Sequence, residues 1–80
     1  MKTIEAIAKR LSALLDEKKM TQYSLCKKIG IDASNIYNIL YRRTKTITLN
    51  NLLLICDGLG ITIQDFFNDT LFGRENLEID

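Results

Sequence analysis

The strongest constraint on the fold is Gly30, which stands between two apolar stripes of helical spacing. The stripe before it consists of Leu25, Cys26 and Ile29, and the stripe after it consists of Ile36, Ile39 and Leu40. Apolar residues three and four positions apart form one buried face of a helix. Glycine ends a helix readily because it adopts the left-handed conformation at little steric cost. With Thr21 and Asp32 as caps, the pattern predicts helix, tight turn and helix over roughly Thr21 to Tyr41.

The segments on either side of this unit predict three more helices. The first covers about residues 3–19, with Thr3 as its cap. The next lies between Thr48, which caps it, and Gly60, which ends it. The last is short and begins at Thr62, in a pattern close to a capping box.

Together these patterns predict an all-α, compact five-helix domain over residues 1–68. The chain has 80 residues and no proline, and no repeat or linker divides it. A polar loop is expected over residues 42–47, after the helix that follows Gly30. Residues 69–80 are weakly patterned, so we expect a C-terminal tail that frays or contacts a second copy.

Charge is distributed unevenly along the chain. Residues 1–45 contain ten basic and four acidic residues, a net charge of +6, whereas residues 46–80 contain one basic and six acidic residues, a net charge of −5. A basic half favours contact with phosphates, and an ordinary solvated surface is the alternative interpretation.

Several functional classes have little support in the sequence. No secretory segment or membrane-spanning run is evident, so the chain is expected to be cytoplasmic. The only two cysteines, Cys26 and Cys56, are expected to be buried and reduced, and there is no histidine, so we expect no metal site. No glycine-rich phosphate loop or carboxylate pair suggests an enzyme or a cofactor.

Two stretches of the chain carry a family resemblance. They read Met20-Thr21-Gln22-x-x-Leu25-x-x-Lys28-Ile29-Gly30-Ile31-x-x-Ser34-x-Ile36-x-x-Ile39 and Leu49-x-x-Leu52-Leu53-x-Ile55-Cys56-x-Gly58-Leu59-Gly60-Ile61-Thr62-Ile63-x-x-Phe66-Phe67. Over about residues 4–67 the chain resembles the Cro and phage-repressor type, or lambda repressor-like XRE-type, of helix-turn-helix proteins. Many members have glycine directly after the third helix. Here that corner consists of Tyr41, Arg42 and Arg43.

The resemblance implies that the third helix enters the major groove of double-stranded DNA. It implies base-reading roles for four residues on one face of that helix, Ala33, Ser34, Tyr37 and Asn38. Hydrogen bonds and methyl contacts to base edges suit such small, amide and aromatic side chains. Gln22 falls where the family contacts a phosphate. The other expected contacts to the DNA backbone are Asn35, Tyr41, Arg42, Arg43 and Lys45.

A domain of this size makes few base contacts, so a homodimer on a two-fold operator is expected, formed in solution or only on DNA. The apolar candidates for the dimer contact are Leu54, Phe67, Leu71 and Phe72. The function expected is a transcriptional regulator, as a repressor, with no small-molecule effector evident. The alternative is a protein-interaction module, such as the DNA-binding antitoxin of a toxin pair or a phage regulator that binds a protein.

Overall fold

The computed structural model describes residues 1–78, which form helices and connecting loops. Its elements in chain order are α1 (Thr3–Glu17), α2 (Gln22–Ile29), α3 (Ala33–Leu40), α4 (Leu49–Leu59), α5 (Ile63–Phe67) and a 3-10 turn, η1 (Thr70–Phe72). No strand occurs within these residues, so the prediction of a five-helix, all-α domain is confirmed. No helix among the described residues is long and apolar enough to span a membrane.

Threonines begin three of the helices, as the sequence predicts. The hydroxyl oxygen of Thr21 accepts from the backbone N–H of Ser24 at 3.0 Å. The hydroxyl oxygen of Thr48 likewise accepts from a backbone N–H in the first turn of α4. At α5 the box is reciprocal, because the Thr62 hydroxyl accepts from the N–H of Asp65 while the Asp65 carboxylate accepts from the N–H of Thr62. Each cap satisfies a backbone donor that has no partner inside its helix.

Two predicted caps differ in the structure. Thr3 is the first residue of α1, and Lys2 occupies the cap position with no side-chain cap bond. Asp32 has the extended backbone of a cap residue at α3, but its side chain accepts no cap bond. The predicted helix starts therefore hold to within one residue, whereas these two side-chain roles are wrong.

Four helix ends close through a residue in the left-handed region. Glycine provides it after α2 and α4, at Gly30 (φ 71°) and Gly60 (φ 72°). After α1 and α3 the left-handed residue comes one position later, at Lys19 (φ 53°) and Arg42 (φ 56°). Arg42 donates its N–H to the Ile39 carbonyl, and the next residue donates back five positions, which is the Schellman arrangement. The corner after α3 thus closes without glycine, at a steric cost that glycine avoids.

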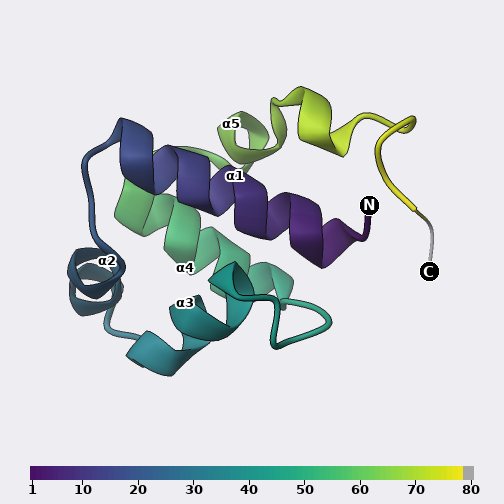
Figure 1. The fold of residues 1–80 in the computed structure, drawn as a ribbon. Coiled ribbons are helices and arrows are strands. Elements are labelled where there is room, and N and C mark those ends of the chain that lie inside the picture. Colours follow the sequence, from purple (N-terminus) through teal and green to yellow (C-terminus); the bar gives the residue numbers. More distant parts are fainter. Residues whose placement is uncertain (79–80) are drawn as a thin grey trace.

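The core lies among the packed helices, because α2 packs against α3 and α4, α1 packs against α3, and α5 packs against α4. Figure 1 shows α1 across the middle of the domain, with α3 below it. The centre of the core consists of fully buried side chains, among them Leu11, Leu25, Ile36, Ile55 and Phe66. α2 and α4 approach each other closely at Gly58. A Cβ at that position would lie 2.7 Å from Cδ1 of Leu25 and closer still to Cγ2 of Ile29.

The segment after α5 contacts the rest of the domain over residues 69–78. Phe72 of η1 lies against the core, with its ring centroid 6.0 Å from that of Phe66. The α-amino group of Met1 donates to the Asn76 carbonyl at 2.7 Å, and the N–H of Glu78 donates to the Met1 carbonyl at 2.8 Å. Residues 79–80, the rest of the predicted tail, lie outside the described residues. These contacts join residues 76–78 to the start of the chain.

Candidate nucleic-acid interface

The turn at Gly30 sets α3 against α2 and α1 so that one face of α3 is buried. Ile36 and Ile39 fill the core side of α3, and Leu40 is half-buried beside them. Since these three residues occupy one side of an eight-residue helix, the opposite side points to solvent. Figure 1 shows α3 at the edge of the molecule, with the loop to α4 beside it.

The predicted base-reading residues all lie on α3, but they are not equally exposed. Ala33, Ser34 and Tyr37 are exposed, and the Tyr37 side chain keeps 41% of its area accessible. Asn38 is half-buried. Together with Asn35 it lines a small hollow of about 180 Å³ between α3, the α3–α4 loop and the start of α4. The structure therefore brings the predicted residues to one helix, with the two amides turned toward the loop.

Two aromatic rings and a guanidinium gather at the C-terminal end of α3. The ring centroids of Tyr37 and Tyr41 are 4.4 Å apart, with their planes tilted by 35°. The guanidinium carbon of Arg43 lies over the Tyr37 ring, 5.4 Å from its centroid. That distance lies within the range of a cation–π contact. The sequence analysis predicts DNA contacts for all three residues but does not reveal that the Tyr37 ring contacts both of the others.

The side chains of the adjacent Arg42 and Arg43 contact different parts of the protein. Arg42 lines two grooves along α1: one with Ala8, Lys9, Ser12, Ala13, Asp16 and Leu40, and one of about 460 Å³ with Lys2, Ile4, Glu5, Thr44 and Lys45. Arg43 instead turns back over α3. Gln22, the predicted phosphate contact on α2, is half-buried as the first residue of that helix. The basic side chains thus border α3 on the loop side, toward the start of α1.

Arg10 is a structural residue that the sequence analysis missed. Its guanidinium donates to the carbonyls of Phe66 and Asp65, each at 2.8 Å, and to the Asp69 carboxylate at 3.3 Å. These bonds cap the end of α5 and fasten the following segment to α1. The available signal was its place between Ile7 and Leu14, at the margin of the apolar stripe of α1.

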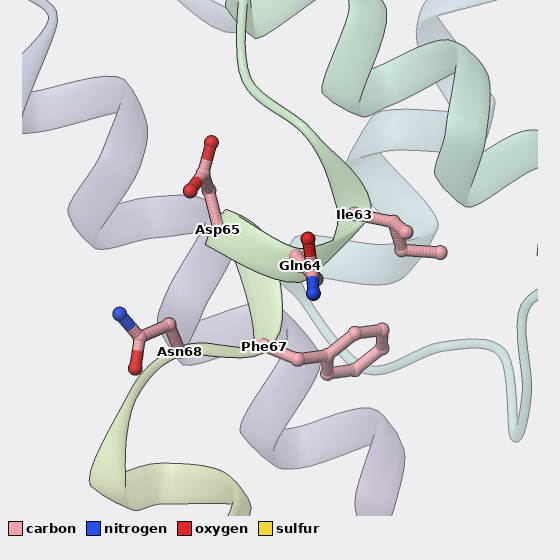
Figure 2. A pocket seen from close by; sticks show the side chains of 5 residues that line it. All are labelled: Ile63, Gln64, Asp65, Phe67 and Asn68. Atoms are coloured by element: carbon pink, nitrogen blue, oxygen red, sulfur yellow. The ribbon is translucent and has the colours of Figure 1, made fainter.

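The four apolar dimer candidates differ in how exposed they are. Leu54 and Phe67 keep 37% and 38% of their area exposed, whereas Leu71 and Phe72 are half-buried. Phe67 and Phe72 meet edge to face with centroids 4.8 Å apart. Figure 2 shows the side chains of Ile63 and Phe67 pointing to the same side of α5, around an open hollow that Gln64, Asp65 and Asn68 also line. Leu49 and Leu53, two residues of the family pattern, add exposed apolar area on α4.

Two thiols and one carboxyl among the described residues have shifted pKa values. Burial raises the pKa of the Cys26 and Cys56 thiols, so both remain protonated at neutral pH. Hydrogen bonds from the Thr62 backbone and side chain lower the pKa of the Asp65 carboxyl. No cluster of three metal-ligating side chains occurs among residues 1–78.

Comparison with known proteins assigns the fold to a family. The crystal structure of the restriction-modification controller protein C.Esp1396I superposes with a TM-score of 0.72 at 30% identity, covering 80% of this chain and 82% of that one. The same controller protein bound to a 19 base-pair DNA duplex gives a TM-score of 0.72 at 30% identity, with coverage of 80% and 84%. Prophage Lp1 protein 11 gives a TM-score of 0.80 at 25% identity, with coverage of 92% and 99%.

A search of curated proteins finds no significant match. The model of the Cro/C1-type helix-turn-helix DNA-binding domain matches residues 10–70, which contain α2, α3, α4 and α5. The resemblance read from the sequence is therefore confirmed, and the chain belongs to the family of Cro/C1-type helix-turn-helix DNA-binding domains.

Proposed function

We propose that this protein is a transcriptional repressor that binds a two-fold operator in duplex DNA as a homodimer. The observation that carries the proposal is the solvent face of α3, where exposed hydroxyl, phenol and amide groups stand opposite buried isoleucines. Such a helix, oriented by the glycine turn before it, fits the major groove. The family assignment supports the same reading. We propose that the protein acts in the cytoplasm and has no enzymatic activity.

The contacts to DNA divide into two classes. Ala33, Ser34, Tyr37 and Asn38 read base edges, because amide and small or aromatic groups on α3 can reach hydrogen-bonding edges and thymine methyl groups. The residues that contact the sugar–phosphate backbone are Gln22, Asn35, Tyr41, Arg42 and Lys45. Arg42 and Lys45 belong here because both are basic residues of the loop that follows α3, where they line one groove beside the start of α1.

Two substitutions separate these classes. Asn38→Ala should cost about 1–3 kcal/mol on the preferred site and relax the preference at one base pair in each half-site. Lys45→Ala should weaken binding to all duplexes alike, and lower the slope of log affinity against log salt by about one. Fluorescence anisotropy at several salt concentrations measures both. Wild-type protein without salt-dependent affinity for any duplex would overturn the proposal.

Dimerisation is proposed through the apolar surface of α4 and α5. Leu54 and Phe67 are exposed there, Phe72 contacts Phe67, and Leu71 is half-buried. A structural relative, C.Esp1396I, is seen as a tetramer on its natural 35 base-pair operator, at 30% identity and a TM-score of 0.73, with coverage of 80% of this chain and 83% of that one. Light scattering with and without DNA tests the assembly. We expect two chains per operator, with Leu54→Lys shifting the complex toward one chain, and a strict 1:1 complex on a saturated operator would contradict the dimer.

Exposed apolar residues on α4 and α5 favour one second candidate. A protein-interaction module, such as the antitoxin of a toxin pair or a phage regulator that binds a protein, would use Leu49, Leu53 and Phe67 to dock its partner. This account becomes the better one if wild-type protein lacks salt-dependent DNA binding but forms a stable complex with the product of an adjacent gene.

A further inference from the structure

We propose that Arg43 is a base-reading residue, which recognises a guanine in the major groove while the ring of Tyr37 holds its guanidinium in place. The proposal rests on the proposed operator binding and names one feature of the operator. From the sequence, Arg43 is expected among the phosphate contacts. The position of Arg43 in the structure favours contact with the edge of a nucleobase instead.

The first argument is where the backbone places Arg43. Its N–H donates to the carbonyl of Asn38 at 2.8 Å, so its backbone is bonded to the last turn of the reading helix. The left-handed residue before it, Arg42, turns the chain back toward α3. Arg43 therefore extends the reading surface at its C-terminal end, next to the aromatic pair.

The second argument is that stacking orients the guanidinium without using its donors. The Arg43 guanidinium lies 5.4 Å from the Tyr37 ring centroid, and the same ring contacts Tyr41 at 4.4 Å. Within residues 1–78, no carboxylate or carbonyl accepts a hydrogen bond from this guanidinium. Its N–H groups therefore remain available to a ligand. A long side chain that is already oriented loses less freedom on binding than a free one.

Two other arginines, at positions 10 and 42, provide a contrast. Arg10 uses its guanidinium on two backbone carbonyls and Asp69, inside the protein. Arg42 lines grooves against α1. Arg43 alone among these three combines available donors with contact to a side chain on the solvent face of α3.

The chemistry of the group indicates which base it takes. A guanidinium presents two parallel N–H donors, and the O6 and N7 atoms of guanine are two adjacent acceptors on the major-groove edge. Arginine paired with guanine is the commonest specific contact of this kind. Tyr37 offers an apolar ring beside it, which can meet a thymine methyl group. We therefore expect a guanine in each half-site, next to a base pair that Tyr37 contacts.

The test begins with selection of bound sequences from random duplexes by wild-type protein. Each guanine of the selected site is then replaced singly by 7-deazaguanine, which lacks the N7 acceptor. One such replacement should weaken wild-type binding about tenfold, and the Arg43→Ala variant should no longer respond to it. Arg43→Lys keeps the positive charge but lacks the two parallel N–H donors of the guanidinium. Its preference for guanine should therefore fall about tenfold, while the salt slope stays unchanged.

Two further variants test the role of the ring, and one serves as a matched control. Tyr37→Phe retains the stack and should keep the response to 7-deazaguanine, whereas Tyr37→Leu should reduce it severalfold. Arg42→Ala removes the neighbouring guanidinium and should lower the salt slope while leaving the guanine preference intact. Circular dichroism confirms that each variant is folded before binding is compared.

The possible outcomes separate this proposal from the one on which it rests. If wild-type protein binds no duplex with salt-dependent, sequence-preferring affinity, both fail. If it selects an operator but Arg43→Ala weakens all sequences alike and lowers the salt slope by about 0.9, Arg43 is a phosphate contact and only this inference is overturned. A response to 7-deazaguanine that persists in Arg43→Ala would assign the guanine to another residue and overturn it equally.

Discussion

Replacing Arg42 with glycine should stabilise the protein. Arg42 has φ 56° at the corner after α3, where the backbone bonds of the helix end require a left-handed residue. That conformation costs a non-glycine residue about 1–2 kcal/mol. Glycine avoids this cost but loses about 0.5–1 kcal/mol more than other residues through its freedom in the unfolded chain. The net gain is about 0.5–1 kcal/mol, which raises the Tm of a domain this small by roughly 3–6 °C.

Arg42→Ala is the matched control, because it removes the same guanidinium but keeps the Cβ that makes the left-handed conformation costly. Urea unfolding followed by circular dichroism should give midpoints in the order Gly above Ala, with equal slopes. Lys19→Gly, with Lys19 at φ 53°, should show a gain of the same size independently. If Arg42→Gly is no more stable than Arg42→Ala, the left-handed strain inferred at this corner is refuted.

Three further predictions concern the core, the caps and the thiols. Gly58→Ala should destabilise by about 1–3 kcal/mol in urea unfolding, because its Cβ would overlap Leu25 on α2, and this outweighs the gain of about 1 kcal/mol in helix propensity. The lowered pKa of Asp65 means that its contribution to stability is present above its unfolded pKa and lost as pH falls through its folded pKa. The Tm should therefore fall below about pH 4, and less so in Asp65→Asn than in wild type. Cys26 and Cys56 should react with a thiol reagent only in denaturant, and their double replacement by alanine should leave DNA affinity within a few-fold, whereas a switch of affinity on oxidation would contradict this.

The helix boundaries could be predicted because their causes are local. A cap at Thr21, Thr48 or Thr62 needs only a donor three residues further on, and a stop at Gly30 needs only the freedom of glycine itself. The packing of residues 69–78 could not be predicted in this way. This packing depends on Arg10, which is more than fifty positions away in the chain. In the sequence, Arg10 looks like any other solvent-exposed basic residue.

The candidate site was predictable to the same depth and no further. Helical spacing determines which face of α3 is buried, and so Tyr37 and Asn38 could be placed on the other face from Ile36 and Ile39 alone. Arg43 lies beyond the end of that helix, where the periodicity stops. Its direction depends on the backbone angle of the residue before it, which composition and spacing do not reveal.

Strain at Arg42 and the position of Arg43 are therefore parts of one structure. An extended residue at position 42 would carry the chain away from α3, and Arg43 would then be an ordinary loop cation that contacts phosphate. With the left-handed turn, the N–H of Arg43 reaches Asn38 and its guanidinium reaches the Tyr37 ring. Glycine at position 42 permits the same turn, so Arg42→Gly should keep the guanine preference. Proline there forces a φ near −65° and removes the N–H bonded to Ile39, so Arg42→Pro should abolish the preference even in protein that still folds.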